Sequence, residues 1–178
     1  QMLRNLVRVF CMRREFRLFE ENRSSPIVDW LKALCRDVKA SSGAKGVGVI
    51  GMCLTGNFAI SLMADDSVLA SVSSQPSLPL GKQSALHLSP QDADQIKARL
   101  DDVGPMIAVR FEGVKFCTAE KFQSIDKTFN DEGCQRIALE TLPGDEHSVL
   151  TRDFVDQAGH PTRLALDQVI AYFTKQLK

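Results

Sequence analysis

The sequence predicts an α/β fold in which a mostly parallel β-sheet lies between helical layers. Short apolar runs alternate with amphipathic segments from residue 26 to the end of the chain. Strict alternation of helix and strand needs crossovers that cover the faces of a parallel sheet. The chain has 178 residues, of which 44% are hydrophobic and 25% charged, as in an ordinary globular domain. We therefore predict a three-layer αβα sandwich, with residues 1–178 as a single domain.

The spacing of apolar residues and the capping signals place the elements along the chain. Ser25 and Pro26 are typical of the N-cap and the first position of a helix. Ser89, followed by Asp92, forms a capping box that begins another helix. Further helices are expected over 2–10, 57–64, 118–130 and 162–177, and strands over 47–50, 68–73, 106–111 and 134–142.

Two helices carry apolar stripes that are expected to face the core. The stripe of the helix that begins at Pro26 consists of Ile27, Leu31, Leu34 and Val38. The stripe of the last helix consists of Leu166, Ile170, Phe173 and Leu177.

Charge and cysteine usage exclude several classes of protein. Lys and Arg number 22 and Asp and Glu also number 22, so the chain lacks the positive excess expected of a nucleic-acid-binding protein. The five cysteines are irregularly spaced and form no CxxC pair. This pattern favours free thiols in a reducing compartment, and hence a cytoplasmic protein with no disulfide framework or metal site. No cofactor is expected.

A charge-free stretch from Gly46 to Ala64 raises the alternative of a membrane span. It contains four glycines and Asn57, and its first residues have the pattern of a strand. A buried strand that turns into a buried helix explains the stretch better, and no membrane partner is expected. No signal peptide is expected either, because no charged and then apolar leader follows Gln1.

The segment from Gly46 to Gly51 matches the G-x-G-x-x-G pattern of dinucleotide-binding proteins. That pattern binds a pyrophosphate only when its glycines follow a strand and open a helix. Here the glycines are predicted within the strand, and no acidic residue ends the next strand. The sequence therefore disfavours nucleotide binding.

The sequence Gly51-Met52-Cys53-Leu54-Thr55-Gly56 stands where a predicted strand becomes a helix. Small residues on both sides of a nucleophile are typical of a nucleophile elbow, a strained turn in which strand and helix backbones pass closely. The start of the helix would favour the thiolate form of Cys53. The alternative is a core cysteine beside two packing glycines, since free cysteines are often buried. Thr55 departs from the usual glycine of the motif.

His147 is the histidine placed to act as a general base. It follows the last predicted strand and precedes the last helix, which is where an elbow-type fold carries its base. His87 and His160, the other two histidines, do not follow the end of a predicted strand. A solvated loop histidine is the alternative reading of His147.

Several segments together resemble the dienelactone hydrolase family of α/β-hydrolases. They are VGVIGMCLTG (47–56), ADDSVLASVSSQPSLP (64–79), VRFEGVKFCTAEKF (109–122) and LPGDEHSVLT (142–151), together with CMRREF…SPIVDWLKAL (11–34). The resemblance implies a Cys-His-Asp triad that hydrolyses lactones or other small esters. Cys53 matches the nucleophile of that triad and His147 matches its base.

The chain departs from the family pattern in two respects. The acid of the triad would fall at position 114, which is Val114 here, and Glu112 is the nearest substitute. The family sheet also has strands before the elbow, including one that supplies an oxyanion-hole amide, and these are not apparent. The Leu54 amide is then the oxyanion donor within the motif. The chain is expected to be the C-terminal portion of a longer family domain.

The sequence thus predicts a hydrolase of small esters or lactones in which Cys53, His147 and Leu54 act, with Glu112 as a substitute acid. The alternative is a weak or inactive relative that serves as a binding or interaction domain. Missing strands would leave an open sheet edge, through which a homodimer is expected.

Overall fold

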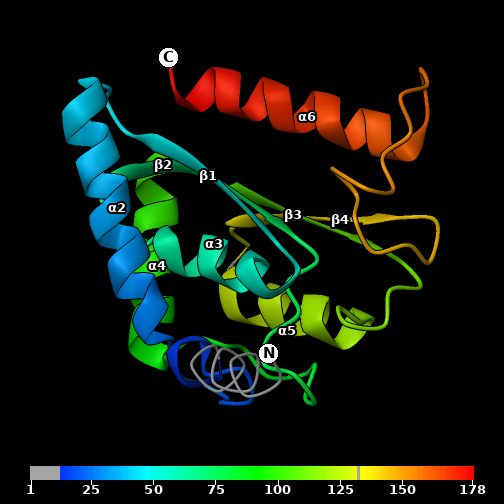
Figure 1. Ribbon diagram of the computed structural model, residues 1–178, viewed down its shortest axis with the longest axis horizontal. Helices are drawn as coiled ribbons and strands as arrows, with labels where there is room; N and C mark the ends of the chain where they lie inside the picture. The colour runs from blue at the N-terminus through cyan, green and yellow to red at the C-terminus, as the bar shows by residue number, and fades with distance from the viewer. Residues whose placement is uncertain (1–12, 132) are drawn as a thin grey trace, which may run out of the picture.

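Four parallel strands form the centre of the computed structural model, which describes residues 13–131 and 133–178 (Figure 1). Each strand pairs with its neighbour in the sequence, so the strand order is β1-β2-β3-β4. The strands are β1 (Val47–Met52), β2 (Val68–Ser74), β3 (Met106–Phe111) and β4 (Ile137–Leu142).

Helices cover the sheet on both faces, as Figure 1 shows. The three crossover helices α3, α4 and α5 lie together on one face, and α6 crosses the other face. The helices are α2 (Pro26–Ser42), α3 (Gly56–Leu62), α4 (Pro90–Val103), α5 (Ala119–Phe129) and α6 (Pro161–Gln176), and a 3-10 turn η1 (Cys53–Thr55) precedes α3. The predicted three-layer α/β fold with a parallel sheet is confirmed.

The larger core fills the space between the sheet and the helices α3 to α5. Phe58, Leu100 and Phe129 are among its buried members, one from each of these helices. On the α6 face a smaller cluster joins Val72 and Ile107 to Val169. Because both faces of the sheet are covered, β3 is buried along its whole length, and its residues are apolar apart from Arg110.

The apolar stripes of the two outer helices were predicted in part wrongly. In α2 the side chains of Val28 and Cys35 are buried, whereas Leu34 and Val38 are exposed. The helix packs against α3 and β1, and Leu34 and Val38 in the second half of the stripe remain exposed. At α6, Ile170 and Leu177 of the predicted stripe are likewise exposed, and the buried residues of the helix are Thr162, Ala165 and Val169.

Two helix caps differ in how closely they follow the prediction. At α4, Ser89 Oγ accepts a hydrogen bond from Asp92 N at 3.1 Å, which is one half of the predicted capping box. The other half is absent, because Ser89 N donates to Ser24 Oγ at 3.3 Å and not to the Asp92 carboxylate. At α2, Ser25 stands at the N-cap but donates its hydroxyl to the Phe16 carbonyl oxygen at 2.6 Å. Ser25 therefore fastens the preceding segment instead of capping its helix. The helix expected over 2–10 lies outside the described residues.

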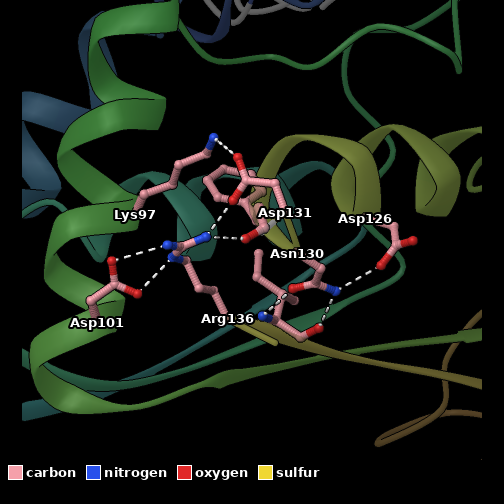
Figure 2. A network of polar contacts seen from close by, with 8 residues as sticks. Lys97, Asp101, Asp126, Asn130, Asp131 and Arg136 are labelled. Atoms are coloured by element: carbon pink, nitrogen blue, oxygen red, sulfur yellow. Dashed lines mark hydrogen bonds and ion pairs between the residues drawn. The ribbon is translucent and has the colours of Figure 1, made fainter. Parts of the chain in front are cut away.

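The start of β4 was also predicted too early, because residues 134–136 lie outside the strand, which begins at Ile137. Figure 2 shows the polar network that holds this segment. The guanidinium of Arg136 binds both carboxylate oxygens of Asp101, at 2.7 and 3.1 Å, and also pairs with Asp131. The side chain of Asn130 bonds the backbone N–H and C=O of Ile137. The network joins α4 to the entry of β4.

β1 is an edge strand of the described sheet, and Ile50 and Met52 on it are 47% and 38% exposed. The homodimer through this edge stays a prediction. Among the described residues, no helix has the length and hydropathy that a membrane crossing requires.

His87 fixes the segment before α2 to the body of the protein. Its ring is buried, and Nε2 lies 2.9 Å from the carbonyl oxygen of Arg17. A carbonyl only accepts, so Nε2 carries the proton, and Nδ1 has no hydrogen-bond partner within the described chain. Burial lowers the pKa of His87, and the nearby Lys121 ammonium adds to this effect, while the bond to Arg17 and the Glu20 carboxylate oppose it.

The buried position of His87 predicts that the free energy of unfolding decreases in acid. The pKa of His87 is lower in the folded state than the value of about 6.5 in an unfolded chain. Below about pH 6.5 the unfolded state therefore binds the proton more readily, and the free energy of unfolding falls as the pH falls. His87→Gln keeps a side-chain N–H but does not titrate. We expect urea midpoints of the wild type to drop more steeply with acid than those of His87→Gln; parallel profiles would contradict this account.

Candidate active site

Cys53 lies at the tip of a strand-turn-helix, as the elbow motif predicts. It follows the last residue of β1 and begins η1, and its side chain is half-buried. Its backbone φ is +55°, in the left-handed region that residues other than glycine seldom adopt. Strained backbone of this kind persists only where the surrounding structure enforces it.

Three neighbours of Cys53 explain why the sequence forms this turn. A Cβ atom on Gly51 would overlap the carbonyl oxygen of Thr55, and one on Gly56 would lie 3.0 Å from the Cα of Pro76. Thr55 Oγ1 donates to the carbonyl oxygen of Met52 at 2.8 Å and accepts from Met52 N at 2.9 Å. Thr55, which departs from the usual motif, thus closes the turn with its hydroxyl.

The glycines of the G-x-G-x-x-G pattern serve strand packing. Gly48 and Gly51 lie within β1, and a Cβ on Gly48 would crowd the side chains of Phe173 in α6 and of Leu177, which follows that helix. They do not open a helix, so their backbone cannot form the phosphate cradle of a dinucleotide site. The absence of nucleotide binding stays a prediction.

The loop after β2 meets the elbow at Ser77. Ser77 Oγ lies 3.6 Å from Cys53 Sγ, and Ser77 N donates to the carbonyl oxygen of Cys53 at 3.2 Å. The next residue, Leu78, exchanges two hydrogen bonds with the side chain of Asn57 in α3, at 2.8 and 2.9 Å. These bonds place the loop directly beside the sulfur.

A buried lysine holds the same loop from the other side. Lys121 Nζ in α5 donates to the carbonyl oxygen of Leu78 at 2.6 Å and also to that of Ala85. The side chain is fully buried, and burial lowers the pKa of Lys121 to about 8. Carbonyl oxygens are its described partners, so the loop supplies the dipoles that a buried ammonium needs.

His147 stands in the loop after β4, half-buried, with its ring edge-on to the ring of Phe116 at a centroid distance of 6.2 Å. Asp153 Oδ2 accepts hydrogen bonds from His147 N at 3.0 Å and from Ser148 N at 2.9 Å. Asp153 therefore shapes the loop through its backbone. Gln75, at the end of β2, donates to the carbonyl oxygen of the preceding residue, Glu146, at 3.2 Å.

These contacts gather the loops that follow β1, β2, β3 and β4 at the carboxyl edge of the sheet, where α/β proteins build their sites. No hydrogen bond joins Cys53 to His147 within the described residues. Leu54 lies in η1, directly after the cysteine. The roles of Cys53, His147 and Leu54 therefore stay predictions.

The two candidate positions for a triad acid differ sharply in their surroundings. Val114 is buried in the core at 4% exposure, so an apolar residue occupies the position where the family acid would fall. Glu112 is exposed, and its carboxylate makes no hydrogen bond or ion pair to any described residue. Its backbone N–H donates to the carbonyl oxygen of Leu142 at 2.8 Å. Glu112 as a substitute acid stays a prediction.

The loop that carries these two positions is held by Arg110, whose importance the sequence did not reveal. Arg110 is buried, and its Nη1 donates to the carbonyl oxygens of Phe111, Glu112 and Cys117, each at 3.1 Å. Its guanidinium also stacks over the ring of Phe122. The backbone of the loop thus accepts all three hydrogen bonds of Arg110 Nη1, whereas the buried Nε has no hydrogen-bond partner among the described residues.

Other residues of the site were also missed by sequence reasoning. Ser77 contacts Cys53, and Asp153 contacts His147. Ser77 and Asp153 both lie in loops, where no periodic sequence pattern marks a residue as part of a site. The polar Gln75 directly after an apolar strand was a usable signal, because residues at that place face the site edge of a parallel sheet. No cluster of three or more His, Cys, Asp or Glu residues suited to a metal ion occurs in the described part of the chain.

Comparison with known proteins places this geometry in a family. No curated protein sequence matches the chain at a significant level. Solved structures with similar folds include Arabidopsis thaliana SOBER1 (TM-score 0.56, 13% identity), which aligns over 85% of this chain and 63% of its own. Carboxyl esterase 2 from Tuber melanosporum has a TM-score of 0.54 and 18% identity, and aligns over 85% of this chain and 59% of its own. Esterase Pf2001 from Pyrococcus furiosus has a TM-score of 0.52 and 14% identity, and aligns over 85% of this chain and 62% of its own.

The chain thus spans less than two thirds of the length of these structures. At such identities the likeness shows the fold, which is of the α/β-hydrolase type. The model of the dienelactone hydrolase family matches residues 11–177, nearly the whole chain, and the chain therefore belongs to the dienelactone hydrolase family.

Proposed function

We propose that the protein hydrolyses small esters or lactones with Cys53 as the nucleophile and His147 as the base. The observation that carries the proposal is the left-handed Cys53 at the elbow between β1 and α3, on the carboxyl edge of a parallel sheet. Family membership supports the same reaction class. The chain covers less than two thirds of its structural relatives, so its activity and substrate class are proposals.

In the proposed reaction the thiol of Cys53 gives its proton to His147, and the sulfur attacks the carbonyl carbon. A C–S bond forms, and the Leu54 amide stabilises the oxyanion. The oxyanion collapses, the leaving alkoxide takes the proton from His147, and a thioester remains on Cys53. His147 then deprotonates a water molecule, which hydrolyses the thioester and restores the thiol.

The alternative function is that of a binding or interaction domain with little catalysis. The apolar Val114 at the expected acid position and the solvated carboxylate of Glu112 favour it. Cysteine tolerates the loss of an acid better than serine does, because a thiol ionises near neutral pH. We therefore favour a weakened enzyme over an inactive relative. The free thiols also support a reducing compartment such as the cytoplasm.

The relative reactivity of the thiols tests whether Cys53 is a nucleophile. Cys117 is fully buried, and burial raises its pKa to about 12. Burial and the Asp65 carboxylate raise the pKa of Cys35. For these reasons both thiols should be alkylated slowly, so a faster reaction at Cys53 than at Cys117 or Cys35 would not by itself show that Cys53 is activated. The informative reference is Cys134, which is exposed and free.

We expect iodoacetamide at neutral pH to alkylate Cys53 at least about tenfold faster than Cys134, because an activated thiolate outreacts an ordinary surface thiol. Peptide mass spectrometry over a time course measures both rates in one sample. The variant Cys134→Ser should leave the rate at Cys53 unchanged. Equal rates at the two positions would remove the main support for a nucleophilic Cys53.

A substitution at Glu112 tests whether this residue acts as the triad acid. Exposed charges interact weakly because water screens them, so Glu112→Gln should lower turnover of an activated ester by less than about tenfold. Loss of the acid in a serine triad costs about 10⁴. Glu120→Gln, an exposed glutamate at the start of α5, serves as the control. A loss near the larger figure, with the fold intact, would make Glu112 a full triad acid.

Val114→Asp tests the same point by gain of function. The side chain is buried, so the new carboxylate lowers stability, and activity must be compared at a temperature where circular dichroism shows the variant folded. We expect faster ester hydrolysis in Val114→Asp than in the uncharged control Val114→Asn. No gain in the folded variant, together with a silent Glu112→Gln, would favour the binding-domain alternative.

A further inference from the structure

A fully buried hydroxyl points at the candidate nucleophile. Ser77 Oγ lies 3.6 Å from Cys53 Sγ, which is hydrogen-bond range for sulfur. The side chain of Ser77 is 0% exposed, so bulk water does not reach it. Within the described residues, Cys53 Sγ is the hydrogen-bond partner of this hydroxyl.

The position of the hydroxyl proton follows from these contacts. A buried hydroxyl that donates to nothing is costly, and two of the buried serines of β2, Ser71 and Ser73, avoid this cost by donating to carbonyl oxygens. Ser71 donates to Ala59 at 2.7 Å and Ser73 to Gly56 at 2.8 Å. For Ser77 Oγ, the hydrogen-bond partner is the sulfur of Cys53 instead of a carbonyl oxygen. When Cys53 is a thiolate, its sulfur can only accept, and the hydroxyl must then be the donor.

The hydroxyl is also held in place before any reaction occurs. Ser77 N donates to the carbonyl oxygen of Cys53, and the following Leu78 is bonded by both Asn57 and Lys121. Gly56 lets the loop approach the elbow, since a side chain there would crowd Pro76. A donor fixed in this way needs little reorganisation when negative charge appears on the sulfur.

We propose that Ser77 is a further catalytic residue, whose hydroxyl donates a hydrogen bond to the thiolate of Cys53 and stabilises it in the free protein. The inference rests on the proposed role of Cys53 as nucleophile. The thiol proton goes to His147, and Ser77 keeps its own proton throughout. When the C–S bond forms, the sulfur loses its negative charge and the bond from Ser77 weakens.

This mechanism makes a prediction that a purely structural role does not. Removing the donor lowers the fraction of thiolate at neutral pH, but it leaves each remaining thiolate at least as nucleophilic. In Ser77→Ala, the pH midpoint of Cys53 alkylation by iodoacetamide should rise by about one to two units, the size of a hydrogen bond to a charged group. The rate plateau at high pH should equal or exceed that of the wild type.

The experiment measures alkylation of Cys53 against pH in the full chain by peptide mass spectrometry. Ser71→Ala is the matched control, since it removes an equally buried, hydrogen-bonded hydroxyl that does not contact the sulfur. An upward shift in Ser77→Ala alone supports the proposal. An unchanged midpoint, a plateau that falls without a shift, or an equal shift in Ser71→Ala overturns it.

Alkylation does not depend on ester turnover, so the two proposals fail separately. If the midpoint shifts but the wild type hydrolyses no ester, the Ser77 contact stands and the proposed function fails. If esters are hydrolysed through Cys53 but the midpoint does not shift, only the role of Ser77 fails.

Discussion

The close passage of backbone at the end of β1 is the constraint on which the rest of the site depends. The chain must leave the strand, place Cys53 at a positive φ and enter α3 within a few residues. Gly51 and Gly56 permit this, because a side chain at either position would meet backbone atoms. The strain at Cys53 has to be balanced by packing elsewhere, and the fully buried helix α3 supplies that packing.

The loops around the elbow are held by polar side chains whose partners are backbone atoms. Asn57 and Lys121 bind Leu78, and Arg110 and Asp153 bind the loops after β3 and β4. Burying two cations without a carboxylate partner is costly unless every donor finds an oxygen. Here the carbonyl oxygens of the loops accept hydrogen bonds from Lys121 Nζ and Arg110 Nη1, and these bonds also fix the site, although the buried Arg110 Nε has no partner among the described residues.

Local patterns explain what could be predicted from the sequence. The order of the elements and the elbow at Cys53 depend on apolar periodicity and small residues, which are visible over short stretches. The buried side of α2 and α6 could not be predicted, because it depends on which neighbours are present. Ser77 lies 24 positions from Cys53, and only the folded loop reveals their contact.

Trapping of the covalent intermediate tests most directly whether Cys53 is a nucleophile. The full chain is mixed with p-nitrophenyl acetate, quenched in acid during turnover, digested and analysed by mass spectrometry. The account predicts an acetyl group on the peptide that contains Cys53, and its loss in Cys53→Ala. Release of p-nitrophenol with no acetyl group on Cys53, or at an equal rate in Cys53→Ala, would contradict it.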